Sequence, residues 1–176
     1  YGGAGVVAFD NSPTRGTLSW RTEPGPHAST VIDLLACADR LLALHRSLLP
    51  DSPEHHGIRS TQNWVGGSSY HPLDADFVPP PPELVPDLVA DLLTYLNGAT
   101  HAPLIQAALV HAQFETIHPF VDGNGRTGRL WHTLLLSHWR PALAWLPIES
   151  VIRDRQEGYY EAIARSNARG SSEAFV

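Results

Sequence analysis

The segment His101–Ile117 constrains the fold more than any other part of the chain, because it is apolar on nearly every side of a helix. Pro103 stands in its first turn, where proline is tolerated. Pro119 disfavours helical geometry at His118, which ends the helix there. A helix that is apolar all round usually lies at the centre of a domain. The segment therefore predicts a buried central helix around which the rest of the chain packs.

Other segments with helical patterns predict an all-α domain. The segment 84–97 has a clear apolar stripe at spacings of three and four residues, and Asn97-Gly98 closes it. Periodicity and capping residues predict the remaining helices. These are expected over residues 29–49, about 124–139 and about 154–167.

A short hairpin, called the flap below, is expected over residues 57–70. Residues 58–65 alternate partly between apolar and polar side chains, and Gly66-Gly67 can turn the chain back. An extended stretch over 77–82 follows, because it ends in four consecutive prolines. The sequence thus predicts a helical bundle with one small β-hairpin.

The length of 176 residues suggests one domain, with a loop-rich N-terminal extension over 1–28 and the folded domain over 29–176. A net charge of −6 argues against nucleic-acid partners, and no apolar run approaches the roughly 20 residues that span a membrane. The single cysteine, Cys37, fits a reducing, cytoplasmic compartment, and its apolar neighbours predict a buried, inert thiol. The chain has no lysine, which excludes a lysine-based phosphate loop. It also has no methionine, which indicates a fragment or a trimmed chain.

The run His118–Arg129 reads His-Pro-Phe-Val-Asp-Gly-Asn-Gly-Arg-Thr-Gly-Arg and lies between the central helix and the start of the next one. A helix N-terminus carries unpaired N–H donors and about half a positive charge. Glycines let those donors turn toward a bound anion. Gly123, Asn124 and Gly125 therefore form a candidate phosphate cradle.

Charged side chains complete this candidate site. Arg126 and Arg129 lie three residues apart on one helix face, and arginine suits bidentate phosphate contacts. Asp122 is a candidate Mg²⁺ ligand beside phosphates. His118 is a candidate general base near pH 7, and the positive helix end is expected to help keep it neutral. A capped helix after an ordinary Asx-type turn would explain Asp-Gly-Asn-Gly, but not the whole run.

Every defined position of the run matches the signature of the Fic (Fido) family, His-Pro-Phe-x-(Asp/Glu)-Gly-Asn-Gly-Arg-x-x-Arg. The chain resembles that family from about residue 29 to residue 176. The segment 58–67 is similar to the family's flap, 113–117 to its approach to the signature, and 158–163 to a downstream helix. The resemblance implies a Fic-type helical bundle with the hairpin flap over the active site.

The resemblance also implies transfer of AMP from ATP to a Ser, Thr or Tyr hydroxyl of a target protein, with release of pyrophosphate. In that reaction His118 would deprotonate the hydroxyl, Asp122 would hold Mg²⁺, and Phe120 would anchor the loop in the core. The phosphates would be held by Gly123, Asn124, Gly125, Arg126 and Arg129.

The flap would align a segment of the target protein as an added strand through Asn63, Trp64 and Val65. Trp64 is equally compatible with packing of the flap itself. Phosphoryl transfer, transfer of another nucleotide or of phosphocholine, and a non-catalytic binding module stay open as alternatives.

Many Fic proteins are inhibited by a helix with Ser/Thr-x-x-x-Glu-Gly/Asn, whose glutamate pairs with the second arginine of the signature, here Arg129. Glu157 is followed by glycine, but Arg153 stands four residues before it. Ser19 stands four residues before Glu23, but Pro24 follows. The inhibitory motif is therefore expected upstream, downstream, in a separate antitoxin-like protein, or nowhere. The oligomeric state stays open, with a homodimer among the options.

The ten histidines do not predict a zinc site, because they show no His-Glu-x-x-His spacing and have no cysteine partner. His111 and His132 are expected to be buried and hydrogen-bonded near the centre. Trp131, Trp139 and Trp145 are expected in the core.

Overall fold

The computed structural model describes residues 37–67, 72–98, 101–170 and 175. Within these ranges the regular structure is helical and no strand forms, which confirms the predicted all-α class. The predicted extension 1–28 lies outside the described residues. None of the described helices is long and apolar enough to cross a membrane.

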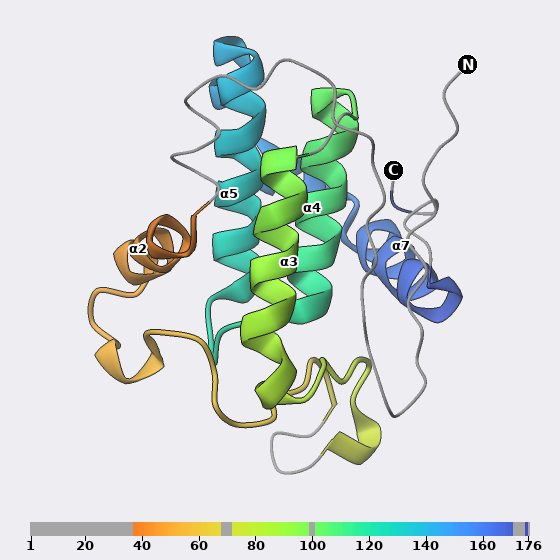
Figure 1. The fold of residues 1–176 in the computed structure, drawn as a ribbon. Coiled ribbons are helices and arrows are strands. Elements are labelled where there is room, and N and C mark those ends of the chain that lie inside the picture. The colour runs from red at the N-terminus through yellow and green to blue at the C-terminus, as the bar shows by residue number, and fades with distance from the viewer. Residues whose placement is uncertain (1–36, 68–71, 99–100, 171–174, 176) are drawn as a thin grey trace.

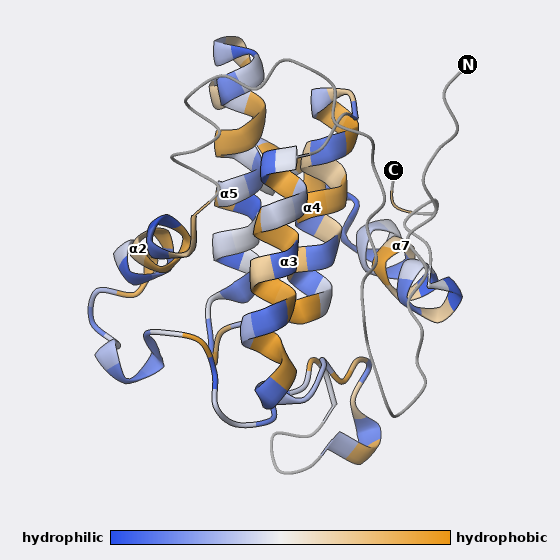
Figure 2. Ribbon diagram, in the orientation of Figure 1, coloured by the Kyte–Doolittle hydropathy of each residue, from blue (hydrophilic) through white to orange (hydrophobic). Residues whose placement is uncertain are grey.

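Three helices, α3 (Val85–Gly98), α4 (Pro103–Ile117) and α5 (Asn124–Trp139), run alongside one another and form the centre of the bundle (Figure 1). Helix α4 packs against both of the others, most extensively against α5. The apolar residues of the three helices gather where they face each other (Figure 2). The predicted central helix is confirmed.

Most core residues come from the apolar stripe of α3 and from α4, which is apolar on nearly every side. Phe114 and Ile117 of α4 are fully buried, as is Phe120 in the loop that follows. The rings of Phe114 and Phe120 lie 6.0 Å apart, and Trp131 of α5 meets Phe114 edge-on at 5.7 Å. The aromatic cluster thus joins the loop after α4 to the core.

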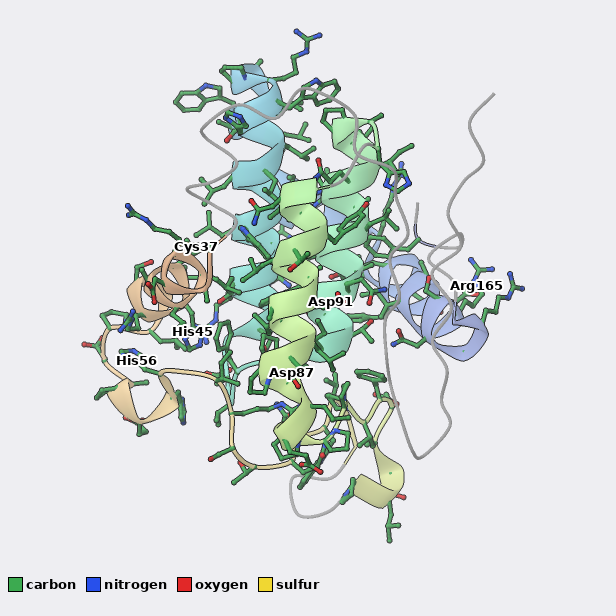
Figure 3. All side chains as sticks on the ribbon, viewed as in Figure 1. Cys37, His45, His56, Asp87, Asp91 and Arg165 are labelled. Carbon is green, nitrogen blue, oxygen red and sulfur yellow. The ribbon has the colours of Figure 1, made fainter. Side chains whose placement is uncertain are left out.

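Two outer helices lie on opposite sides of this core (Figure 1). Helix α2 (Ala38–Leu48) packs against α5 and α3, and α7 (Gln156–Arg169) packs against α4. The start of the helix predicted over 29–49 lies outside the described residues. Cys37, expected to be buried, is exposed at the start of α2, because it precedes the first turn and none of the described elements covers it (Figure 3).

The C-terminal region differs from the single helix expected over about 154–167. It forms α6 (Ile148–Asp154) and α7, separated at Arg155, whose backbone leaves the helical region. Short 3₁₀ helices join the longer elements. They are η1 (Pro53–His55), η2 (Pro72–Asp74), η3 (Pro82–Leu84) and η4 (Pro141–Trp145).

The three tryptophans separate into core and surface. Trp131 is 1% exposed, as expected, but Trp139 is 40% and Trp145 is 88% exposed. Trp145 is the last residue of η4. It lies outside the face of α5 that packs against α4, and no described helix covers it. The expectation for Trp139 and Trp145 was wrong, because an aromatic residue alone does not reveal which way a helix end faces.

The flap segment forms an isolated antiparallel bridge between Val65 and Phe77 in place of a regular hairpin. The Val65 N–H donates to the Phe77 carbonyl at 2.9 Å, and Asp76 N–H donates back to Val65 at 2.9 Å. Gly66 and Gly67 both adopt positive φ, as a turn requires, but the bridge partner lies ten residues farther along the chain, after η2. No two-stranded hairpin forms among the described residues, where Val65 pairs with Phe77; residues 68–70 of the predicted hairpin lie outside the described residues.

Replacing Trp131 by alanine is expected to lower the free energy of unfolding by about 3–5 kcal/mol, because it leaves a large cavity beside Phe114. The matched change Trp145→Ala is expected to cost less than about 0.5 kcal/mol, because that side chain is already in water. Urea unfolding of the two variants measures both values. Equal losses would contradict the assignment of the core.

Candidate active site

His118 occupies a left-handed backbone position directly after α4, with φ 51° and ψ 60°. Among the described residues it is the one non-glycine with positive φ. Its N–H closes the last turn of α4 by donating to Phe114 at 2.9 Å. Such a conformation strains a residue with a side chain, and it persists only where neighbouring contacts hold it.

Arg59, near the start of the flap segment, provides those contacts. Its side chain is 2% exposed, and its Nε donates to the His118 carbonyl at 2.8 Å. Its Nη2 donates to Pro80 at 2.6 Å and to Ile117 at 3.4 Å, and its Nη1 donates to Thr61 at 3.3 Å. One guanidinium therefore ties the end of α4 to the flap segment and to the extended stretch that follows it.

The His118 ring is arranged as a neutral base. Its Nδ1 lies 3.3 Å from the carbonyl oxygen of Glu115. Because a carbonyl only accepts, Nδ1 carries the hydrogen and Nε2 keeps its lone pair. Burial lowers the pKa of His118 to about 4, and the positive Arg59 adds to the effect. The predicted neutral state is supported, but its main cause is burial and not the helix end.

The loop after His118 is closed by the side chain of Asn124. The Phe120 N–H donates to Asn124 Oδ1 at 2.9 Å, and Asn124 Nδ2 donates to the Phe120 carbonyl at 2.8 Å. Asn63 of the flap donates to the same carbonyl at 3.0 Å. Both polar atoms of the buried Asn124 amide are thus engaged with backbone, so its main contribution to an anion site is its own N–H at the start of α5.

A second anchor comes from α2. His45 is fully buried, stacks on Phe120 with ring centroids 3.8 Å apart, and places Nε2 2.9 Å from the Asp122 carbonyl. The side chain of His45 points from α2 toward the lower end of α5 (Figure 3). Burial lowers the pKa of His45, so the neutral ring donates to this carbonyl.

Gly123 is required by both conformation and space. Its φ is 80°, and a Cβ there would lie 2.9 Å from Leu49 and 3.4 Å from His45. Helix α5 starts at the next residue, and no side chain caps it. The N–H groups of its first turn, from Asn124, Gly125 and Arg126, therefore have no partner within the helix and point out of its end.

The two arginines converge on this helix end. Arg126 Nη2 lies 3.1 Å from Asp122 Oδ2, and a Cβ on Gly125 would lie 2.8 Å from Arg129 Nη1. Gly125 thus leaves room for the Arg129 guanidinium to lie along the first turn of α5. The predicted cradle residues Gly123, Asn124 and Gly125 are brought together with both arginines.

Asp122 fits a magnesium ion that also binds phosphate. Its side chain is 53% exposed; Oδ1 accepts from the Gly123 N–H at 2.6 Å, and Oδ2 faces Arg126. The described residues contain no group of three or more carboxylate, histidine or cysteine ligands. One exposed carboxylate suits Mg²⁺, which usually takes one or two protein ligands together with substrate phosphates.

His111 and His132 lie deeper in the bundle. His111 is buried and hydrogen-bonded, as expected, but His132 is only partly buried and neither of its ring nitrogens has a hydrogen-bond partner among the described residues. Their rings stack with centroids 5.0 Å apart, and His111 Nε2 pairs with the Tyr159 hydroxyl at 2.8 Å. Burial lowers the pKa of His111 to about 3, assisted by His132, and burial lowers that of His132 to about 4. This neutral stack joins α4, α5 and α7 behind the loop.

Sequence reasoning placed the loop residues together but missed Arg59 and His45. Both act on backbone carbonyls of residues far away in the chain, so no local spacing reveals them. A weak signal existed for Arg59, since an arginine next to the apolar Ile58 in an alternating stretch has no adjacent acidic partner.

The Fic/DOC family model matches residues 35–136, more than half of the chain. This chain belongs to the Fic/DOC family. Among solved structures, a Fic family protein from Desulfovibrio desulfuricans G20 is similar to this Fic domain with a TM-score of 0.70 and 41% identity. That likeness covers 80% of this chain and 42% of the other.

Two curated relatives carry the name protein adenylyltransferase. The one from Caenorhabditis briggsae, fic-1, is 38% identical over 119 residues, which cover 64% of this chain and 21% of the relative. The one from Drosophila grimshawi, Fic, is 33% identical over 156 residues, which cover 85% of this chain and 29% of the relative. This Fic domain therefore spans less than a third of the length of these two relatives.

In the folded protein the His118 imidazole is expected to titrate with a pKa of about 4. In the urea-unfolded chain it should titrate near ~6.5. Because the folded pKa is the lower one, His118 favours the folded state fully above the unfolded pKa, and this contribution is lost as pH falls through the folded pKa. NMR titration of the His118 ring measures the folded value. A folded pKa near the unfolded one would contradict the buried, neutral base.

Proposed function

We propose that this Fic domain transfers AMP from ATP to a Ser, Thr or Tyr hydroxyl of a target protein and releases pyrophosphate. The observation that carries this proposal is the neutral His118, with Nε2 free to accept a proton, held beside the uncapped end of α5 where Arg126 and Arg129 converge. The names of the curated relatives agree with it.

In the proposed reaction the target hydroxyl oxygen attacks the α-phosphorus of ATP. Its proton passes to Nε2 of His118, which is the role that a neutral imidazole with a hydrogen-bonded Nδ1 can perform. The bond between the α-phosphorus and the oxygen that bridges to the β-phosphate breaks, and pyrophosphate leaves. The products are the AMP-ester of the target and pyrophosphate, with the proton on His118.

The end of α5 supplies the stabilisation of phosphate charge. Its N–H groups at Asn124, Gly125 and Arg126 are fixed donors, and fixed donors need no reorganisation as charge develops. The guanidinium groups of Arg126 and Arg129 bind the β- and γ-phosphates and orient the leaving group. Arg126 then exchanges its contact with Asp122 for phosphate oxygens.

Asp122 would hold the Mg²⁺ ion, since its carboxylate is exposed at the rim of the cradle. When bound, Mg²⁺ neutralises phosphate charge and makes pyrophosphate a better leaving group. His55 lies near the same carboxylate, with Nδ1 4.0 Å from Asp122 Oδ2.

The target protein is proposed to dock on the flap. The flap segment is tied to the active-site loop through Asn63, and its backbone near Trp64 and Val65 runs antiparallel to the Phe77 region. A target segment added along this edge would bring its hydroxyl toward His118. A separate antitoxin-like inhibitor, a homodimer and a cytoplasmic location stay predictions from the sequence.

Incubation of the purified domain with a target-containing lysate and ATP labelled at the α- or the γ-phosphate tests the reaction. The expected result is protein-bound label from α-labelled ATP only. His118→Ala is expected to lower this labelling by at least about a hundredfold, since a general base contributes that much.

The control for folding is His138→Ala, at the end of α5 away from the loop, which is expected to leave labelling unchanged. Label that moves to protein from the γ-phosphate alone would replace the proposal by phosphoryl transfer. Full labelling by the His118 variant would remove the assignment of the base.

A further inference from the structure

His55 is a side chain beside the active-site loop to which the proposed reaction gives no role. It is the last residue of η1, and its Nδ1 lies 4.0 Å from Oδ2 of Asp122. This nitrogen is shielded from water and has no hydrogen-bond partner among the described residues. A polar atom in that state costs free energy unless a bound group satisfies it.

The separation of the two atoms suits a bridging ion better than a direct contact. At 4.0 Å, His55 Nδ1 and Asp122 Oδ2 are too far apart for a hydrogen bond. An ion that binds two such atoms at about 2.1 Å keeps them about 3 Å apart at a right angle and about 4.2 Å apart in line. One ion can therefore contact both atoms with little movement of either side chain.

A cation already faces Asp122 at this point. Arg126 Nη2 lies 3.1 Å from Asp122 Oδ2, the same oxygen that His55 approaches. Oδ1 accepts from the Gly123 N–H at 2.6 Å, which fixes the direction of the carboxylate. In the proposed reaction Arg126 leaves Oδ2 for phosphate, and this oxygen is then open to a metal ion.

Ring contacts fix the positions of His55 and Asp122 relative to each other. His56, the next residue, donates from Nε2 to the Leu49 carbonyl at 2.7 Å. Its ring meets that of His45 edge-on, with centroids 6.1 Å apart. His45 in turn donates to the Asp122 carbonyl at 2.9 Å, so the end of η1 and the active-site loop share one support.

The other side of the His55 ring faces a second carboxylate. Its Nε2 lies 3.9 Å from Oε1 of Glu54. Metal-bound histidines usually direct their second ring nitrogen at a carboxylate or a carbonyl, which fixes the tautomer. The ring thus lies between Glu54 and Asp122, with Nδ1 on the side of Asp122. The alternative is a protonated His55 that only pairs with the two carboxylates, and it predicts a different effect of His55 on metal binding.

We propose that His55 Nδ1 is a second protein ligand of the divalent ion that Asp122 holds, and that it makes the site select Mn²⁺ over Mg²⁺. The proposal rests on the proposed function for the presence of an ion at Asp122. Imidazole nitrogen binds transition-metal ions, whereas Mg²⁺ takes oxygen ligands. A site with one nitrogen and one carboxylate therefore gains affinity for Mn²⁺ and little for Mg²⁺.

Electron paramagnetic resonance of Mn²⁺ tests the proposal without catalytic turnover. The purified protein is titrated with MnCl₂, alone and with a non-hydrolysable ATP analogue, and Mg²⁺ affinity is measured by competition. His55→Ala is expected to weaken Mn²⁺ binding at least about tenfold, because even indirect partners of a metal ligand contribute that much. Mg²⁺ affinity should stay within about threefold of the wild type, since the ion loses no oxygen ligand.

Spin-echo spectroscopy of the bound ion identifies the ligand atom. Mn²⁺ on the wild type is expected to show coupling to an imidazole nitrogen, and this coupling should disappear in His55→Ala and in His55→Asp. Because His55→Asp supplies oxygen in place of nitrogen, it is expected to keep an ion site and to lose the preference for Mn²⁺. His138→Ala is the matched control, since that histidine is exposed in the last turn of α5.

Mn²⁺ bound without nitrogen coupling, or bound as tightly by His55→Ala as by the wild type, would overturn the proposal. Tighter binding by His55→Ala would show that a protonated His55 competes with the ion for the carboxylates. Absence of Mn²⁺ binding both with and without the ATP analogue would also overturn it. A protein that shows the His55 coupling but transfers no label from ATP would contradict the proposed function alone.

Discussion

The arrangement of the active site depends on the hydrogen bonds of one buried guanidinium, that of Arg59. Arginine cannot shed its charge by deprotonation in a protein, so burial must be offset by strong acceptors. Backbone carbonyls of Thr61, Pro80, Ile117 and His118 fill this role. Three of these carbonyls are at ends of regular elements or beside proline, where no helix partner would otherwise satisfy them.

This single group has three consequences. It stabilises the left-handed conformation of His118, and it fixes the flap segment, which carries Arg59, relative to the loop. It also adds a positive charge near the imidazole, which together with burial keeps the base neutral. Arg59 thus fixes the position of His118 and adds to the effect of burial, which is the main cause of its neutral state.

The loop itself is preorganised by polar side chains that bind backbone. Asn124 and His45 hold the carbonyls of Phe120 and Asp122, so the N–H groups at the start of α5 are left to face outward. Gly123, Gly125 and Gly128 each leave room for a different neighbour: the α2 side chains, Arg129 and Glu115. The site is therefore a set of donors fixed before any anion binds, which is the condition for electrostatic stabilisation without reorganisation.

The sequence was sufficient for the features that depend on local order. The end of α4 followed from Pro119 and an all-round apolar segment, and the start of α5 followed from the glycines, whereas α4 begins at Pro103, two residues after the expected His101. It was insufficient where long-range contacts decide. Nothing local distinguishes Trp131 from Trp145, or reveals that Val65 pairs with Phe77 across η2. Arg59 escaped for the same reason, since its four acceptors belong to segments up to 59 residues away.

The most direct test of this account is the effect of Arg59→Lys on AMP transfer and on ATP affinity, measured on the same protein with Arg46→Lys as the exposed control. Lysine keeps the charge but cannot span four carbonyls, so His118 should lose its position while the phosphate site of α5 stays intact. The account predicts transfer lowered by about a hundredfold and ATP affinity within about threefold of the wild type, with the fold retained. Undiminished transfer by a folded Arg59→Lys variant would contradict it.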